Sequence, residues 1–240
     1  MSFIYYHVPK TGGVSFRKLL EDSFRVNKIL HITSPSKGET EEYLRQYKFI
    51  HGHFFEGDLP VLNNYRKLIS IREPISRCIS TYNFLREQNL ESSLWREIDK
   101  KRIYIAKNSS LLEFFNSRIE EIYFHSNNMQ TRILCGIRDS GVQLTNAHFE
   151  IAYKKINEFD FVALNCEFEL SQLLFALKFG FICPSEQARM NKSTTHSEIS
   201  NSVIETISIL NEWDIKLYNK VKQVGLYKIN KIKVSCFYDR

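Results

Sequence analysis

The sequence lacks the patterns that mark disulfide frameworks, zinc ribbons and membrane spans. Its 5 cysteines are odd in number, widely spaced and without a Cys-x-x-Cys pair, which predicts free thiols in a reducing compartment. No apolar run reaches the roughly 18 residues that a membrane helix needs. Met1 lies just ahead of the first predicted strand, which leaves no room for a signal peptide. We therefore expect a soluble, cytoplasmic protein without a transmembrane segment.

Long basic runs are also missing, although the chain is moderately basic. Lys and Arg number 33 against 27 Asp and Glu, for a formal net charge of +6 and an isoelectric point of about 9.0. This charge favours anionic ligands, but the longest basic run is Lys100-Lys101-Arg102 and no nucleic-acid recognition motif is present. Nucleic acid is therefore not expected as a partner. Repeats are absent, and the 240 residues predict a single domain over 1–240.

Short apolar strands alternate with helices along much of the chain. Strands are expected at residues 3–8, 28–32, 49–55, 67–72 and 159–164, and helices at 14–25, 39–47, 74–86, 167–179 and 200–222. This alternation predicts an α/β domain with a central parallel sheet flanked by helices. Residues 3–8 are expected to be a central strand, because their β-branched and aromatic side chains suit burial on both faces. A helical elaboration, inserted over about 91–157, is expected as well.

The turn after the first predicted strand concentrates groups that suit an anion. Gly12 and Gly13 allow a sharp turn with close backbone approach, and Ser15 can cap the helix that follows. Backbone N–H groups and the positive end of the helix dipole then form an anion site, to which Lys10 and the Thr11 hydroxyl add donors. The residue order excludes a Walker A loop and a GxGxxG dinucleotide fingerprint. An ordinary strand-to-helix turn remains the alternative.

A second group of candidate residues lies in the segment 72–82, after the fourth predicted strand. Ser76 and Ser80, four residues apart, lie on one face of the predicted helix. The Arg72 guanidinium beside the helix start, with a hydroxyl behind it, would make a good phosphate clamp. The alternative is a surface ion pair between Arg72 and Glu73.

The tripeptide His51-Gly52-His53 places two imidazoles on the same side of a strand. They suit a general base at a strand end, a metal pair or a purely structural role, but no nearby Cys or His offers further metal ligands, and we expect no metal. Lys10, His53 and Arg72 all follow the carboxyl ends of predicted strands, where parallel sheets bind their ligands. The three segments are therefore expected to converge on one cleft.

These motifs resemble those of sulfotransferases that use 3'-phosphoadenosine 5'-phosphosulfate (PAPS). Pro-Lys-Thr-Gly-Gly-x-Ser after a strand is similar to their 5'-phosphosulfate loop, and Arg-x-Pro-x-x-Arg-x-x-Ser-x-Tyr to their 3'-phosphate-binding segment. The resemblance implies a P-loop-like sandwich fold and PAPS as the donor, with adenosine 3',5'-bisphosphate as the product. The implied cofactor-binding residues are Lys10, Thr11, Gly12, Gly13, Val14, Ser15, Arg72 and Ser80, with Lys192 and Ser193 from a closing loop.

The His-Gly-His tripeptide resembles glycan-hydroxyl sulfotransferases of the heparan sulfate 2-O type. On this resemblance His53 is the catalytic base, His51 its helper, and Lys10 the group that stabilises the leaving phosphate. Family members often have Arg where this chain has His7, so His7 becomes a candidate substrate-binding residue and a rival base. The segment 127–136 resembles the helix with the pattern NxQTRxLCG in the same family.

The sequence therefore predicts a PAPS-dependent sulfotransferase, from a bacterial source, that modifies a hydroxyl of a saccharide or polysaccharide. A P-loop-type nucleotide-dependent kinase is one alternative, but it should carry Gly-Lys-Ser/Thr and a magnesium-binding carboxylate after a strand. A non-catalytic module for acidic glycans is the other; it would explain the basic charge but would not need the Lys10 turn.

Overall fold

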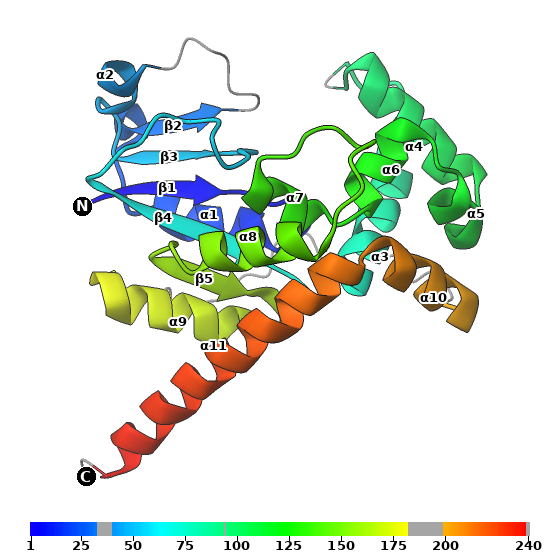
Figure 1. Cartoon of the computed structure of the whole chain (residues 1–240). Helices are drawn as coiled ribbons and strands as arrows, with labels where there is room; N and C mark the ends of the chain where they lie inside the picture. The colour runs from blue at the N-terminus through cyan, green and yellow to red at the C-terminus, as the bar shows by residue number, and fades with distance from the viewer. Residues whose placement is uncertain (33–39, 94, 182–198, 239–240) are drawn as a thin grey trace.

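The centre of the molecule is a five-stranded parallel sheet in the order β2-β3-β1-β4-β5 (Figure 1). A computed structural model describes residues 1–32, 40–93, 95–181 and 199–238, with the side chains of 14–16 and 226–238 left out. The strands are β1 (Ser2–Tyr6), β2 (Ile29–Ile32), β3 (Phe49–Gly52), β4 (Tyr65–Ile71) and β5 (Phe161–Leu164). This confirms the predicted α/β fold with its first strand at the centre of a parallel sheet.

Helices cover both faces of the sheet and stand beside the carboxyl ends of its strands (Figure 1). They are α1 (Gly13–Glu21), α2 (Glu41–Leu44), α3 (Pro74–Glu87), α4 (Glu97–Asn108), α5 (Leu111–Asn116), α6 (Glu120–Ser126), α7 (Met129–Cys135), α8 (Asn146–Ile156), α9 (Phe168–Phe179), α10 (Asn201–Leu210) and α11 (Glu212–Tyr238). Short 3₁₀ turns occupy Val26–Lys28 and Asn165–Glu167.

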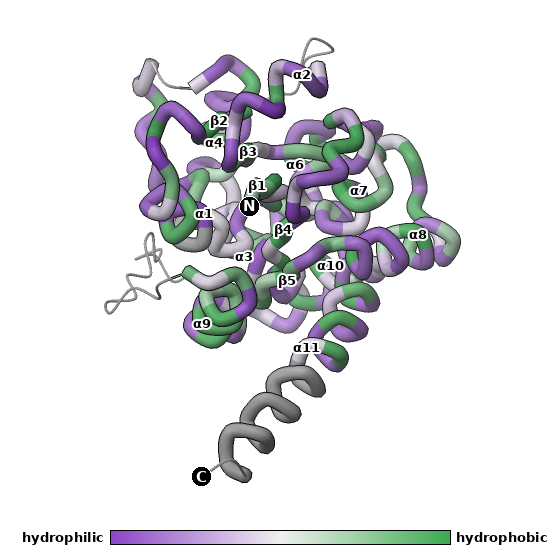
Figure 2. Tube along the Cα trace, turned by 90° about the vertical axis from the view of Figure 1, so that its left-hand side faces the viewer, coloured by the Kyte–Doolittle hydropathy of each residue, from purple (hydrophilic) through white to green (hydrophobic). Residues whose placement is uncertain are grey.

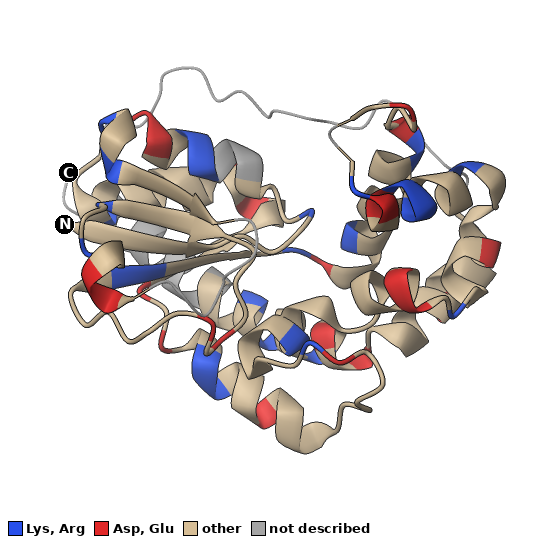
Figure 3. Cartoon of the chain, turned by 90° about the horizontal axis from the view of Figure 1, so that it is seen from above, with Lys and Arg blue, Asp and Glu red and all other residues tan. Residues whose placement is uncertain are grey.

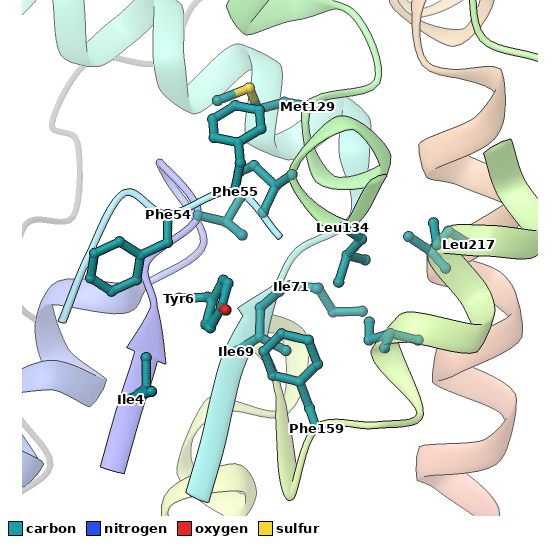
Figure 4. Close-up of a cluster of buried hydrophobic side chains, with 14 of the residues drawn as sticks. Ile4, Tyr6, Phe54, Phe55, Ile69, Ile71, Met129, Leu134, Phe159 and Leu217 are labelled. Atoms are coloured by element: carbon teal, nitrogen blue, oxygen red, sulfur yellow. The ribbon is translucent and has the colours of Figure 1, made fainter. Parts of the chain in front are cut away.

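Each face of the sheet has its own hydrophobic core, because side chains alternate along the strands. One face packs against α1 and the largely hydrophobic α9 (Figure 2), through a cluster that includes Phe3, Tyr5, Leu20 and Phe175. The other face packs against α7, α8 and α11 (Figure 4), through a cluster that includes Ile4, Tyr6, Ile69, Leu134 and Leu217. Full burial of one such side chain contributes about 1.5–3 kcal/mol, so both cores hold β1 firmly in place.

A third core lies beyond the sheet, among α3, α4, α5, α6 and α10. It includes Cys78, Tyr82, Ala106, Phe114 and Ile207. The helical stretch predicted over residues 91–157 is therefore shared between two cores: α4 to α6 join the third core, whereas α7 and α8 pack on the sheet.

The prediction of one long helix over 200–222 was wrong, because the chain breaks at Asn211. This side chain is fully buried, and its amide donates hydrogen bonds to the carbonyl oxygens of Ser126 at 2.6 Å and Ile207 at 2.9 Å. Its oxygen accepts from the backbone N–H of Asn128 at 3.1 Å. A hydrogen-bonding side chain at this point favours the end of one helix and the start of another over a continuous helix. Beyond the break, α11 runs past the sheet and away from it (Figure 1).

Ser15 does not cap α1 as predicted. The helix already begins at Gly13, and Gly12 occupies the N-cap position in the left-handed conformation, so Ser15 lies within the first turn. The predicted free thiols are confirmed for Cys78, Cys135 and Cys166; Cys183 and Cys236 lie outside the described side chains. None of the described helices combines the length and apolar character that a membrane span requires.

Candidate active site

The turn between β1 and α1 is held in a conformation that only a few residue types tolerate. Gly12 has φ of 81°, and a side chain there would overlap the Asn165 amide. A side chain on Gly13 would overlap the imidazole of His7. Lys10 also has a positive φ, 65°, which costs a residue with a side chain about 1–2 kcal/mol. Backbone strain of this kind is often stored at functional sites.

The Thr11 side chain fixes the turn from within. Thr11 is buried, and its hydroxyl donates to the Val8 carbonyl at 2.8 Å, while the Thr11 carbonyl accepts from the Asn165 amide at 3.1 Å. The turn is thereby anchored to the end of β5. Since α1 starts at Gly13, the first N–H groups of this helix have no partner within the helix and are available to an anion. Val14 and Ser15 lie on this first turn, and their side chains are outside those described.

Arg72 connects the turn to the end of β4. Its Nη1 donates to the Lys10 carbonyl at 3.1 Å, and its Nε donates to the Ser76 hydroxyl at 2.8 Å. The predicted convergence of Lys10 and Arg72 is therefore present in the structure. The hydroxyl in contact with Arg72 is that of Ser76, while Ser80 lies one turn farther along α3 and is half-buried.

Glu73 caps α3 with its side chain. The carboxylate accepts from the N–H groups of Ile75 at 2.9 Å and Ser76 at 2.7 Å. A negative charge at this end of a helix is favourable, because it complements the helix dipole. The Glu73 carboxylate thus has a structural role at the helix start, next to the Arg72 guanidinium.

Gln130 holds Arg72 in place and was missed as a site residue by the sequence reasoning. Its side chain accepts from the Arg72 N–H at 2.9 Å and donates to the Arg72 carbonyl at 2.9 Å. The signal was available in the NxQTRxLCG pattern, in which Gln130 is the Gln. This pair of bonds fixes the backbone from which the guanidinium extends.

Lys10 lies in a setting that weakens its positive charge. Burial, together with the charge of Arg72, lowers the pKa of the Lys10 ammonium group to about 8. The ammonium nitrogen is 4.0 Å from the centre of the Phe84 ring, a cation–π contact with α3. Lys10 is therefore charged at neutral pH but gives up its proton more readily than an exposed lysine.

His53 and His7 lie together at the ends of β3 and β1. Their ring centres are 4.9 Å apart in an edge-to-face arrangement, and the His7 N–H donates to the Gly52 carbonyl at 2.9 Å. The His53 side chain is partly exposed to solvent, but other groups surround it closely. Desolvation, together with the nearby charges of His31 and Arg17, lowers the pKa of His53 to about 4. Burial and the His53 charge lower the pKa of His7 to about 3. Both imidazoles are therefore neutral at pH 7, so each can accept a proton.

His51 lies two residues before His53 on the same side of the strand, and it is buried away from solvent. Its ring stacks on His31, with centres 4.6 Å apart, and its Nε2 lies 3.3 Å from a carboxylate oxygen of Glu21. Burial, with the charge of His31 next, lowers the pKa of His51 to about 3. The exposed fraction of His51 is only 2%, which favours a supporting role over direct contact with a substrate.

Within the described residues, no group of three or more His, Cys, Asp or Glu side chains is arranged to hold a metal ion. The metal-pair interpretation of His51 and His53 therefore finds no third ligand in this part of the chain. Lys192 and Ser193, predicted to belong to a closing loop, lie outside the described residues.

A cavity of about 150 Å³ opens beside these groups. Pro9, Lys10 and His53 form its wall on the sheet side, and residues of α3, α4, α5 and α6 form the opposite wall. The cavity thus lies between the sheet and the third core. Its position at the carboxyl ends of the strands is where ligands of parallel sheets bind.

Comparison with known proteins identifies a family for this chain. A model of the sulfotransferase family matches residues 1–221, which is most of the chain. A search of curated proteins found no match. The matched range includes the strained Lys10 turn, the Arg72 segment and both histidines of the tripeptide. This chain belongs to the sulfotransferase family.

Proposed function

We propose that this protein transfers a sulfuryl group from PAPS to a hydroxyl group of an acceptor, and that the acceptor is a carbohydrate. Sulfuryl transfer itself follows from membership of the sulfotransferase family. PAPS as the donor is supported above all by one observation: the Arg72 guanidinium donates a hydrogen bond to the Lys10 turn at the carboxyl ends of the neighbouring strands β4 and β1. Two phosphate groups need two anion sites, and these segments offer them. The choice of a carbohydrate as the acceptor is supported by the resemblance of the His-Gly-His tripeptide to glycan-hydroxyl sulfotransferases.

In this proposal the turn and the start of α1 bind the 5'-phosphosulfate. The free N–H groups of the first helical turn point toward an anion at its end, and the glycine pair leaves room for close approach. Lys10 stabilises negative charge on the departing phosphate as the bond between sulfur and the bridging oxygen breaks. Arg72, held by Gln130, and the hydroxyls of α3, including Ser80, bind the 3'-phosphate. Lys192 and Ser193 contribute from the closing loop.

His53 is the proposed base. As a new bond forms between the acceptor oxygen and sulfur, the acceptor hydroxyl must release its proton, and a neutral imidazole accepts it. With a pKa of about 4 in the free protein, the His53 ring is neutral but a weaker base than an ordinary imidazole, and the negative charge of a bound donor raises this pKa toward the working pH. His7 lies against it and is proposed to contact the acceptor, while the buried His51, two residues before His53, supports the end of the strand. Such a base contributes roughly 10²–10⁴-fold to the rate.

The test is a comparison of nucleotides followed by a turnover assay. Adenosine 3',5'-bisphosphate should bind at least tenfold more tightly than ATP in a calorimetric titration, because the 3'-phosphate has its own cation. Radiolabelled PAPS should then pass its label to a member of a panel of glycans. Preference for ATP would support a kinase instead, and tight binding of acidic glycans without label transfer would support a binding module.

A further inference from the structure

The cavity beside Lys10 and His53 is small and largely apolar. The apolar members of its helical wall are Phe84, Leu85, Trp95, Ile103, Phe114 and Ile122. Trp95 meets Phe84 edge to face, with ring centres 6.3 Å apart. A cavity of about 150 Å³ is the size that holds one benzene ring. One six-membered ring therefore fills it.

The polar side chains of this wall are already engaged with partners. They are Thr81, Asp99, Arg102, Glu121 and His125. Arg102 bonds to Asp99 and to Nε2 of His125, and Asp99 also accepts from Arg96 at 3.0 Å. Lys101 donates to Glu121 at 2.6 Å, and the Thr81 hydroxyl donates to the Arg77 carbonyl at 3.1 Å. Figure 3 shows blue Lys and Arg residues among red Asp and Glu residues on the helices that lie away from the sheet.

This pairing decides what the cavity can recognise. A bare sugar ring would bring several hydroxyls into a wall whose polar groups are engaged, and each hydroxyl left unpaired weakens binding by roughly tenfold. A carboxylate or sulfate would find Arg102 already neutralised by Asp99, and Lys10 on the opposite wall is assigned to the donor. An apolar ring has no hydroxyls to leave unpaired, and it packs favourably against the aromatic side chains.

We propose that the group bound in this cavity is an apolar, ring-sized part of the acceptor, which places the acceptor hydroxyl next to His53. The proposal rests on the sulfuryl transfer of the proposed function; an aryl glycoside keeps its carbohydrate acceptor, whereas a phenol would replace it. The ring belongs either to a phenol, whose own hydroxyl is sulfated, or to the aryl group of a glycoside, whose sugar hydroxyl is sulfated. Both present the same chemistry to Phe84 and Trp95.

Binding measurements on the full chain test this proposal. The protein is saturated with adenosine 3',5'-bisphosphate and titrated in a calorimeter with phenol, phenyl β-glucoside, methyl β-glucoside and methyl β-glucuronide. The first two should bind at least tenfold more tightly than either methyl glycoside. A difference between phenol and phenyl β-glucoside in the label-transfer assay then distinguishes the two sources of the ring. Equal or tighter binding of a methyl glycoside overturns the proposal.

Trp95→Ala supplies the matched variant, because Trp95 lines the cavity without belonging to the proposed catalytic or nucleotide-binding groups. It should weaken the two aryl ligands by about tenfold and leave the bisphosphate unaffected. Tyr104→Ala, an aromatic truncation at a largely exposed position of the neighbouring α4, should change neither. Aryl binding that survives Trp95→Ala also overturns the proposal. If the protein fails to bind the bisphosphate but the free protein still binds the aryl ligands, the proposal of PAPS as the donor is wrong and the proposal of an aryl-binding cavity stands.

Discussion

Lys10 is the residue at which the strain and the electrostatics of the site meet. Its backbone has a positive φ, its ammonium group is partly buried, and its carbonyl accepts a hydrogen bond from Arg72. Such unfavourable backbone conformation and burial of charge are found in proteins mainly where a function requires the charged side chain. An anion bound at the turn would offset the unfavourable burial of the Lys10 charge, because it stabilises the charged form of Lys10.

The first prediction concerns the pH dependence of nucleotide binding. Lys10 has a pKa of about 8 in the free protein, and a bound phosphate raises it, so binding above pH 8 requires uptake of a proton. The phosphates themselves are fully ionised there, since their second pKa is about 6. The Kd of adenosine 3',5'-bisphosphate should rise by no more than about twofold from pH 7 to 8, and above pH 8 by up to about tenfold per pH unit. Calorimetry across this range measures it.

Lys10→Arg is the control for this prediction. A guanidinium stays protonated over the whole range, so the rise above pH 8 should vanish whatever the absolute affinity. A rise that persists in Lys10→Arg would assign the titration to another group.

The second prediction concerns the base. His53→Ala should lower kcat by about 10²-fold and leave the Kd of the bisphosphate nearly unchanged, because a group that acts in the transition state adds little to ground-state binding. Steady-state kinetics with PAPS and calorimetry measure the two quantities. His51→Ala should lower kcat less, since His51 is buried, and His7→Ala should mainly raise the KM for the acceptor. A near-normal kcat in His53→Ala would transfer the role to His7 or His51.

At the residue scale, the sequence allowed candidate site residues to be selected, but it did not predict their hydrogen-bond partners. Lys10, Arg72 and His53 could be selected because they follow the ends of apolar strands. The contact of Arg72 with Ser76, the pairing of Gln130 with the Arg72 backbone and the Asn165 bond to Thr11 all join distant segments. Such contacts depend on side-chain geometry that no local pattern encodes.

At the scale of elements, α7 and α11 cap each other. The Asp214 carboxylate accepts from the N–H groups of Gln130 at 3.0 Å and Thr131 at 2.7 Å, at the start of α7. In return, the Asn128 side-chain oxygen accepts from the N–H groups of Trp213 at 2.9 Å and Asp214 at 3.0 Å, at the start of α11. This junction fixes the helix that carries Gln130, and therefore the position of Arg72.

The third prediction tests this junction. Asp214 is fully buried, so Asp214→Ala leaves two buried N–H groups without their charged acceptor and should lower the free energy of unfolding by about 3 kcal/mol. Urea unfolding measures the loss. Asp214→Asn, which keeps one acceptor oxygen, should lose less, and Glu212→Ala, at an exposed position of the same turn, should lose under about 0.5 kcal/mol. A loss below about 1 kcal/mol in Asp214→Ala would contradict the role of the cap.

The same junction explains why the long helix was predicted wrongly. The apolar pattern of 200–222 continues across the break, because both α10 and α11 bury one face. The break is caused by Asn211 and its partners, Ser126 at the end of α6 and Asn128 just before α7, which are remote in sequence. Strand positions were predicted more accurately, since burial on both faces leaves a continuous apolar run.

At the scale of the whole molecule, the site lies where separately packed parts meet. The turn after β1 belongs with the sheet, and the Asn165 bond ties it to the end of β5. Arg72, at the end of β4, contacts both this turn and Ser76 of α3, a helix that packs in the third core. A ligand that contacts both the turn and Arg72 therefore links the sheet to the third core. Its binding should stabilise the fold as a whole.

The last prediction follows from this arrangement. A ligand at 100 times its Kd stabilises the folded state by about 2.7 kcal/mol, and in a domain of this size each kcal/mol raises Tm by about 2–4 °C. Adenosine 3',5'-bisphosphate at that concentration should therefore raise Tm by about 5–10 °C in a thermal unfolding scan. Adenosine 5'-monophosphate at the same concentration should raise it far less, because it lacks the phosphate that Arg72 is proposed to bind. Arg72→Ala should reduce the bisphosphate shift to that of the monophosphate and leave the monophosphate shift unchanged. Equal shifts for the two nucleotides in the unaltered protein would remove Arg72 from 3'-phosphate recognition and leave it as a structural link between the turn and α3.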